Sequence, residues 1–288
     1  MYETYSTDDL LDLQPGRVRC VEHRPEGVTD APVLLFVHGF LVDGGVWGEV
    51  PERLAALGYR SIVPTLPLGA HRTPMRPDAE LSPAAVGRLV LEVAESLDLS
   101  GVTLVGNDTG GAICQLALAT DRRRIDRLVL TNCDAFEVFP PRPFDLLFRA
   151  GRHPRLLGPI VQSTRVGRVR TGPLGFGVLT RRRLTPEETR PWVESYCTDK
   201  AVRRDVATFL RNWDRHVLVD ASESLREFNG PALIAWAPED RFFRIELGRR
   251  LLATLPHAEL VEVPDARTFV ALDQPARLAE LIDGFVRR

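Results

Sequence analysis

The sequence predicts an α/β fold: a mostly parallel, doubly wound sheet covered by helices, with a helical region inserted late in the chain. Two observations support this fold class. Short β-branched runs alternate with helical patterns from about residue 30, and the alternation stops after Asn132 before it resumes near residue 231. At 288 residues, the chain is long enough for one main core with an inserted piece.

The predicted strands are short apolar runs bounded by turn residues. They lie at residues 32–37, 59–63, 102–105 and 127–131, then within 231–240 and at 259–263. The clearest predicted helix follows Ser82, because Pro83 suits a first helical turn and Val86, Leu89 and Val93 share one helix face. Further helices are expected around residues 245–255 and from Pro275 onward.

The interruption predicts a helical cap over residues 135–225, which divides the core into residues 1–134 and 226–288. Stretches such as PPRP and GPLGFG are poor strand material. Val206, Phe209, Leu210 and Trp213 have the spacing of a helix.

Composition excludes several classes of partner. The net charge is −2, from 37 basic and 39 acidic residues, so nothing indicates nucleic acid. The arginine runs 122–124 and 181–183 are expected to be solvated surface. The four cysteines form no CxxC pair, which predicts neither a zinc site nor a disulfide framework.

The sequence also predicts a cytoplasmic protein without a membrane partner. Its first residues, MYETYSTDDLLDL, are acidic where a signal peptide would be basic, and no apolar run is long enough to cross a bilayer. A small-molecule substrate is expected, no metal or other cofactor is predicted, and the oligomeric state is left open.

Residues Gly106-Asn107-Asp108-Thr109-Gly110 have the setting of a nucleophile elbow, which is a sharp turn between a buried strand and a helix. Such a turn strains its central residue and lifts that side chain clear of the sheet, and small residues on both sides let the strand and helix approach each other. Asp108 is therefore a candidate catalytic residue. The alternative is an ordinary aspartate that caps the following helix.

This layout resembles the α/β-hydrolase superfamily over most of the chain. His38-Gly39-Phe40 is similar to the family's HG loop, and Trp47 and the late insertion also match. The resemblance implies an oxyanion hole formed by the backbone N–H groups of Phe40 and Thr109. An aspartate at the elbow resembles the haloalkane dehalogenase and epoxide hydrolase branch, which implies that Asp108 is a nucleophile forming an ester with its substrate.

The same resemblance implies an acid and a histidine that activate water against this ester. Asp240, after the seventh strand, is the better candidate for the acid, and Asp134 is the second, although either could instead cap a helix. The histidine belongs in a loop that here reads PDARTF, which places Thr268 at its position. Threonine cannot take a proton from water near neutral pH, so the usual base is missing.

Two other residues are candidate partners of Asp108. His71 lies in a loop expected on the catalytic side of the sheet, and it could replace the base or be an exposed histidine without a role. Tyr196 in the cap could protonate an opening epoxide ring or be buried for packing. Thr109 and Phe40 stand where dehalogenases commonly have halide-binding residues, so halide release has little support.

Three functions remain open. The first is a hydrolase acting through Asp108 on an epoxide, halide or ester-like substrate. The second is a non-hydrolytic lyase, isomerase or cyclase, which the missing histidine favours. The third is a binding protein that keeps the pocket without turnover, against which the retained strain of the elbow argues.

Overall fold

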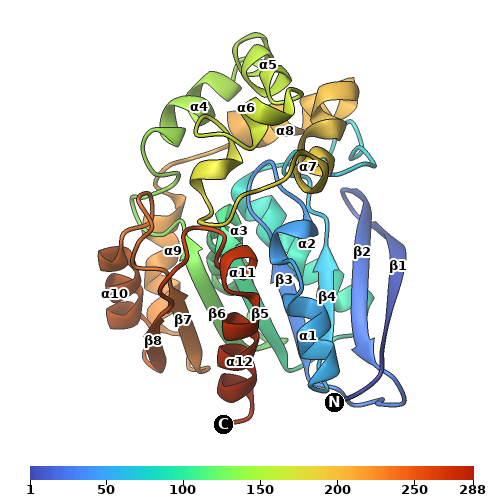
Figure 1. Ribbon diagram of the computed structural model, residues 1–288, viewed down its shortest axis with the longest axis vertical. Helices are drawn as coiled ribbons and strands as arrows, with labels where there is room; N and C mark the ends of the chain where they lie inside the picture. Colours follow the sequence, from blue (N-terminus) through green and yellow to red (C-terminus); the bar gives the residue numbers. More distant parts are fainter.

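The molecule is built on one eight-stranded sheet, shown in the computed structural model of Figure 1. The structure describes residues 1–288, with the side chain of Pro154 excepted. The strand order is β1-β2-β4-β3-β5-β6-β7-β8. The bounds are β1 Thr4–Leu13, β2 Gly16–Pro25, β3 Val33–Val37, β4 Arg60–Pro64, β5 Val102–Asp108, β6 Ile125–Cys133, β7 Ala232–Trp236 and β8 Ala258–Glu262.

Strands β3 to β8 are parallel and confirm the predicted alternation of strands and helices. Their carboxyl ends therefore meet at one edge of the sheet, which is where loops in such sheets gather functional side chains. Strands β1 and β2 were not predicted. They form an antiparallel ribbon, and β2 joins it to β4 in an antiparallel pair.

Core helices cover both faces of the sheet. Helices α1 (Val50–Ala56) and α12 (Pro275–Val286) pack together on one face, while α2 (Pro83–Ser96), α3 (Thr109–Thr120), α9 (Val217–Arg226) and α10 (Ile245–Thr254) pack in succession on the other. The short helices η1 (Gly44–Trp47) and α11 (Val270–Asp273) touch each other. The helix predicted after Ser82 is confirmed: the Ser82 hydroxyl accepts from the Ala85 N–H at 3.1 Å, and the predicted apolar face is buried.

The insertion after β6 forms a second layer of helices above the carboxyl ends of the strands (Figure 1). It contains α4 (Phe144–Gly151), α5 (Pro154–Ser163), α6 (Gly167–Arg170), η2 (Phe176–Val178), α7 (Pro186–Thr198) and α8 (Lys200–Arg211). We call α4–α8 the helical layer. Helix α9, which the expected cap at residues 135–225 would include, packs against α3 and α10 of the core. Within the described residues, no helix has both the length and the apolarity needed to span a membrane.

Candidate active site

Asp108 occupies a strained turn between β5 and α3. Its backbone has φ 54° and ψ −133°, a left-handed conformation that a non-glycine residue adopts only under constraint. A Cβ on Gly110 would overlap the carbonyl oxygen of Val37, and one on Gly106 would lie 2.7 Å from the Cα of Gly111. Asp108 makes no side-chain cap hydrogen bond to α3, so the helix-cap interpretation is wrong.

The Asp108 side chain faces a cavity of about 140 Å³ beneath the helical layer. Phe40 and Thr109 lie beside it, as the resemblance implied, and the remaining walls are mostly apolar. They include Phe144, Leu147, Phe148, Ile160, Val161, Leu174, Phe176, Leu179 and Phe243. No histidine belongs to the described residues that line this cavity. The site is suited to an apolar small molecule held against one carboxylate.

The pKa of Asp108 is raised from 3.8 to about 7, chiefly because burial disfavours the charged form. The backbone N–H groups of Thr109 and Phe40 point to the carboxylate and lower its pKa, but their effect is smaller than that of burial. A Cβ on Gly39 would overlap the Asp108 carboxylate, so glycine is required there for this close approach. The carboxylate and these two N–H groups thus form one compact unit.

Asp134 lies next to this unit. Its Oδ2 accepts a hydrogen bond from the Thr109 hydroxyl at 3.1 Å, and its backbone N–H donates to the carbonyl of Asp108. Burial and the neighbouring Asp108 raise the pKa of Asp134 well above its ordinary value. The helix-cap interpretation of Asp134 is wrong, because the next helix begins ten residues later at Phe144.

Asp240 and Thr268 meet as the resemblance implied for the acid and the residue at the histidine position. The Thr268 hydroxyl donates to Asp240 Oδ2 at 2.9 Å, and both side chains are buried. The Phe242 and Phe243 N–H groups donate to Asp240 Oδ1 at 2.8 and 3.3 Å. These bonds bend the loop before α10, which begins only at Ile245, so Asp240 is not its cap. The arrangement is an acid that orients a hydroxyl rather than an imidazole.

Two asparagines that the sequence reasoning did not select hold these loops together. The Asn107 side-chain amide donates to the Thr268 carbonyl at 2.6 Å and to the Thr131 hydroxyl at 2.8 Å. Asn132 bonds to both the N–H and the carbonyl of Ala237, at 2.7 and 3.0 Å. Asn107 therefore anchors the Thr268 loop beside the elbow. The only available signal was a polar residue inside an otherwise apolar run.

The structure does not bring His71 to the Asp108 cavity. His71 is 2% exposed, so it is not an exposed loop residue. Its Nε2 lies 3.2 Å from Asp205 Oδ2 of α8, and its Nδ1 accepts from the Gly69 N–H at 3.3 Å. With both ring nitrogens occupied, His71 links the core loop to the helical layer and has no lone pair directed at a water near Asp108. This geometry corrects the expectation that His71 replaces the base.

Tyr196 is likewise displaced from the site. It is 1% exposed on α7 and is not among the described residues lining the cavity, so its burial is a matter of packing within the helical layer. His38, of the HG loop, is also buried. Its Nε2 accepts from the Leu66 N–H at 2.8 Å, and its Nδ1 lies 2.9 Å from the Gly39 carbonyl, which shapes the loop that carries Phe40.

A strained acidic elbow, the His38-Gly39-Phe40 loop beside it and a helical layer over the sheet define a scaffold of the hydrolase type. The chain belongs to the alpha/beta hydrolase family, whose model matches residues 34–281. It is 28% identical to the cis-3-alkyl-4-alkyloxetan-2-one decarboxylase of Xanthomonas campestris, over 100% of this chain and 98% of that protein.

Solved structures share the fold at lower identity. The epoxide hydrolase CorEH superposes with a TM-score of 0.76 at 17% identity, covering 98% of this chain and 99% of that one. A mutant of the haloalkane dehalogenase DatA from Agrobacterium tumefaciens gives 0.78 at 20% identity, covering 98% and 97%. The scaffold is therefore common to enzymes of different chemistry, and the site must distinguish among them.

Proposed function

We propose that this protein is a non-hydrolytic enzyme that uses Asp108 to open an alkyl-substituted β-lactone and release carbon dioxide. The proposal rests on the pairing of Asp240 with Thr268, the residue at the position where the resemblance implies a histidine, and on the lack of a histidine among the described residues that line the Asp108 cavity. An ester formed on Asp108 has no base here to activate water. The site therefore favours a substrate whose ester with Asp108 breaks down without water.

A β-lactone, or oxetan-2-one, meets this requirement because it is a strained four-membered cyclic ester. In the first step, one Asp108 oxygen forms a bond to the saturated ring carbon that carries the ring oxygen. The carbon–oxygen bond of the ring breaks, and the ring oxygen leaves with the electron pair as part of a new carboxylate. The N–H groups of Phe40 and Thr109 hold the second Asp108 oxygen, which becomes the ester carbonyl.

In the second step, the bond between the new carboxylate carbon and its neighbouring carbon breaks and its electrons form the carbon–carbon double bond. The bond to the Asp108 oxygen breaks at the same time, which regenerates the carboxylate and releases carbon dioxide and an alkene. No proton moves and no water is consumed. Because attack inverts one carbon and elimination occurs from the opposite side, a cis-lactone yields a cis-alkene.

Two further observations support this substrate class. The cavity walls are aliphatic and aromatic, which suits alkyl chains rather than polar substituents. The full-length relative from Xanthomonas is named as a decarboxylase of a β-lactone with two alkyl groups. Carried over to this chain, that name matches a site where a carboxylate is retained and the water-activating base is replaced.

Hydrolysis of an epoxide or halide by Asp108 is the second candidate. The shared fold of the epoxide hydrolase and the dehalogenase favours it. Hydrolysis requires a base that activates water against the Asp108 ester. Among the described residues, the cavity is lined by no histidine, which is the usual base.

The two candidates differ in whether water enters the product. The purified protein is incubated with a cis-3,4-dialkyl-oxetan-2-one in ¹⁸O-water, and the products are separated by gas chromatography and mass spectrometry. We expect a cis-alkene and carbon dioxide in equal amounts, without ¹⁸O-labelled hydroxy acid. Asp108→Asn should lower the rate at least ~10³-fold, because it removes the attacking group.

Asp220→Asn, an exposed aspartate on α9, is the matched control and should leave the rate unchanged. Hydroxy acid as the main product would support the hydrolytic candidate instead. Alkene formation that persists in Asp108→Asn would remove Asp108 from either mechanism.

A further inference from the structure

Positive charge is concentrated in one part of the helical layer. Residues 142–183 contain ten arginines and a single acidic residue, Asp145, for a net charge of +9. Three of these arginines do not contribute free surface charge, because Arg170 is buried and Arg181 and Arg182 pair with acids outside the segment. Since the whole chain carries −2, the remaining residues sum to −11. This segment includes α4, α5 and α6, which form the outermost part of the molecule above the sheet (Figure 1).

The same segment exposes large apolar side chains. Leu146, Leu156, Ile160, Val166 and Leu174 are 50–92% exposed. Outside it, the large hydrophobic side chains found exposed are those of residues 1–10 together with Val219 and Leu252. Ile160 and Leu174 also line the Asp108 cavity, so the exposed apolar surface continues into the cavity that would receive the substrate. Exposed apolar side chains concentrated in one segment favour an interaction site there.

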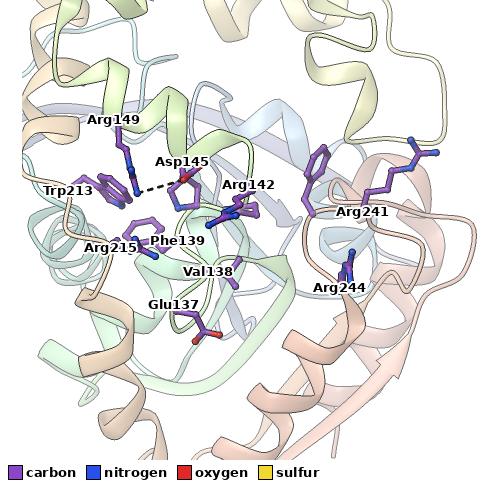
Figure 2. A pocket seen from close by; sticks show the side chains of 13 residues that line it. Glu137, Val138, Phe139, Arg142, Asp145, Arg149, Trp213, Arg215, Arg241 and Arg244 are labelled. Atoms are coloured by element: carbon purple, nitrogen blue, oxygen red, sulfur yellow. Dashed lines mark ion pairs between the residues drawn. The ribbon is translucent and has the colours of Figure 1, made fainter.

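An arginine-lined pocket of about 420 Å³ adjoins this surface (Figure 2). Arg142 and Arg149 come from the segment, and Arg215, Arg241 and Arg244 come from loops next to the core. Among the described residues, only Arg149 of these five has an ion pair, with Asp145 at 3.9 Å.

The other acid in the pocket, Glu137, is bound by Arg250 at 2.9 Å. Pro140 and Pro141 line both this pocket and the Asp108 cavity. A multiply charged anion such as a phosphate is a ligand that arginine side chains lining one pocket favour.

We propose that the surface formed by residues 142–183 docks on an anionic phospholipid layer, with a lipid phosphate held in the arginine pocket. Arginines interspersed with exposed leucine, isoleucine and valine are the composition of interfacial helices. Each exposed arginine without an ion pair among the described residues, such as Arg155 or Arg168, gains energy near an anionic leaflet, while the apolar side chains enter the boundary of the acyl chains. This departs from the sequence expectation of no membrane partner, which rested on the lack of a spanning segment; surface docking needs none.

Docking would give an apolar substrate a route from the lipid into the cavity past Ile160 and Leu174. That route rests on the proposed function, but the docking does not. The test therefore measures binding and not turnover, so the two proposals fail separately.

The experiment is sedimentation of the full chain with vesicles of phosphatidylcholine alone or with phosphatidylglycerol added. We expect binding only to the anionic vesicles, and weaker binding as the salt concentration rises. Arg155→Gln with Arg168→Gln should weaken it by about 30-fold, since each arginine near the surface contributes roughly fivefold. Arg17→Gln with Arg72→Gln removes the same charge from exposed positions elsewhere and should have little effect.

A second pair of variants tests the apolar component. Leu156→Gln with Val166→Gln should weaken binding about tenfold or more. Val219→Gln with Leu252→Gln changes exposed apolar residues outside the segment and is the matched control. Thermal melts establish that each variant is folded.

Three results would overturn the proposal. The first is absence of binding to anionic vesicles, and the second is equal loss in the segment variants and their controls. The third is complete competition by soluble glycerol phosphate or by a single-stranded oligonucleotide, which would assign the arginines to a free anion or to nucleic acid.

Discussion

The elbow and the Asp240–Thr268 pair are neighbouring parts of one site. They differ in how closely their residues match those that the resemblance to hydrolases implies. At the elbow, Asp108 has the strained backbone, the close glycine contacts and hydrogen bonds from the backbone N–H groups of Phe40 and Thr109. At the other end, the acid and its hydrogen bond are in place, but the partner is a hydroxyl.

This difference separates two chemical abilities that hydrolases of this fold combine. A buried carboxylate can attack carbon without help from a base, whereas water must be deprotonated to attack an ester. The site contains a carboxylate that can attack carbon, but its described lining contains no histidine to deprotonate water. The proposed reaction, in which the ester breaks down by elimination, therefore fits the site better than hydrolysis does. The following predictions either sharpen this contrast or remove it.

The largest expected effect concerns the stability of the elbow and needs no substrate. The pKa of Asp108 is about 7 in the folded state and near 3.8 when unfolded. As pH rises from 4 to 7, the unfolded chain loses this proton while the native chain retains it, so folding stability falls. Asp108→Asn does not titrate and should become more stable than the natural protein by up to about 4 kcal/mol at pH 7 and above.

Urea unfolding between pH 4 and 8 measures this difference, with Asp220→Asn as control. A constant gap between Asp108→Asn and the natural protein over this range would show that the elbow carboxyl titrates as an ordinary aspartate. Burial of Asp108 would then not give the elbow the raised pKa on which this contrast depends.

The pH dependence of turnover should show the same ionisation. In the proposed mechanism, attack requires the charged form of Asp108, so kcat/KM should fall by about 50-fold from pH 7 to 5 and approach tenfold per unit at the lower end of this range. Asp240→Asn removes a negative charge that raises the Asp108 pKa, so its profile should shift to lower pH. A flat profile between pH 5 and 8 would contradict attack by an ionised Asp108.

The elbow was predictable from sequence because its constraints are local. Glycine, an acid and glycine after a buried strand mark the turn, although the resemblance of the wider layout was needed to favour an elbow over an ordinary helix cap. The parallel strands were predictable for the same reason, since each is a short apolar run. Strand β1 was missed because it is an edge strand exposed along nearly its whole length, so it lacks apolar alternation. In β2, the alternation of buried Val18 and Cys20 was a signal that could have been used.

The resemblance implied the Asp240–Thr268 pair, but the partners of His71 and Asn107 were not predictable, because residues far away in the chain decide them. His71 was placed correctly on the catalytic side, but Asp205, 134 residues later, binds it. Asn107 reaches a carbonyl 161 residues away. Chain order indicates which loops share an edge of the sheet, but not which side chains within those loops meet.

Replacing Thr268 by histidine should give the Asp240 side of the site a base that can activate water. In Thr268→His, Asp240 stands where the orienting acid belongs, so a water-activating base is in register with it. We expect ¹⁸O-labelled hydroxy acid from the β-lactone to rise at least ~10-fold, at the expense of alkene. Thr268→Asn, which is polar but cannot act as base, is the control. An unchanged product ratio in a folded Thr268→His variant would show that the lack of a base does not decide the outcome.

The smallest expected effect measures what the Thr268 hydroxyl does for Asp240. Thr268→Val keeps the shape of the side chain but leaves a buried carboxyl oxygen without its 2.9 Å donor, which should cost about 1–3 kcal/mol of unfolding free energy. Thr103→Val is the matched control, because Thr103 is similarly buried and lies in β5 away from Asp240.

The sign of the pH dependence identifies the mechanism of this loss. Burial raises the pKa of Asp240, and the Thr268 hydroxyl lowers it, so Thr268→Val should raise it further. The variant must then bind a proton that the natural protein has already released, and its stability deficit should grow as pH rises through the range where the two forms differ. Chemical denaturation at several pH values measures this trend. A deficit equal to that of Thr103→Val, or independent of pH, would mean that Thr268 fills space beside Asp240 and does not stabilise its charge.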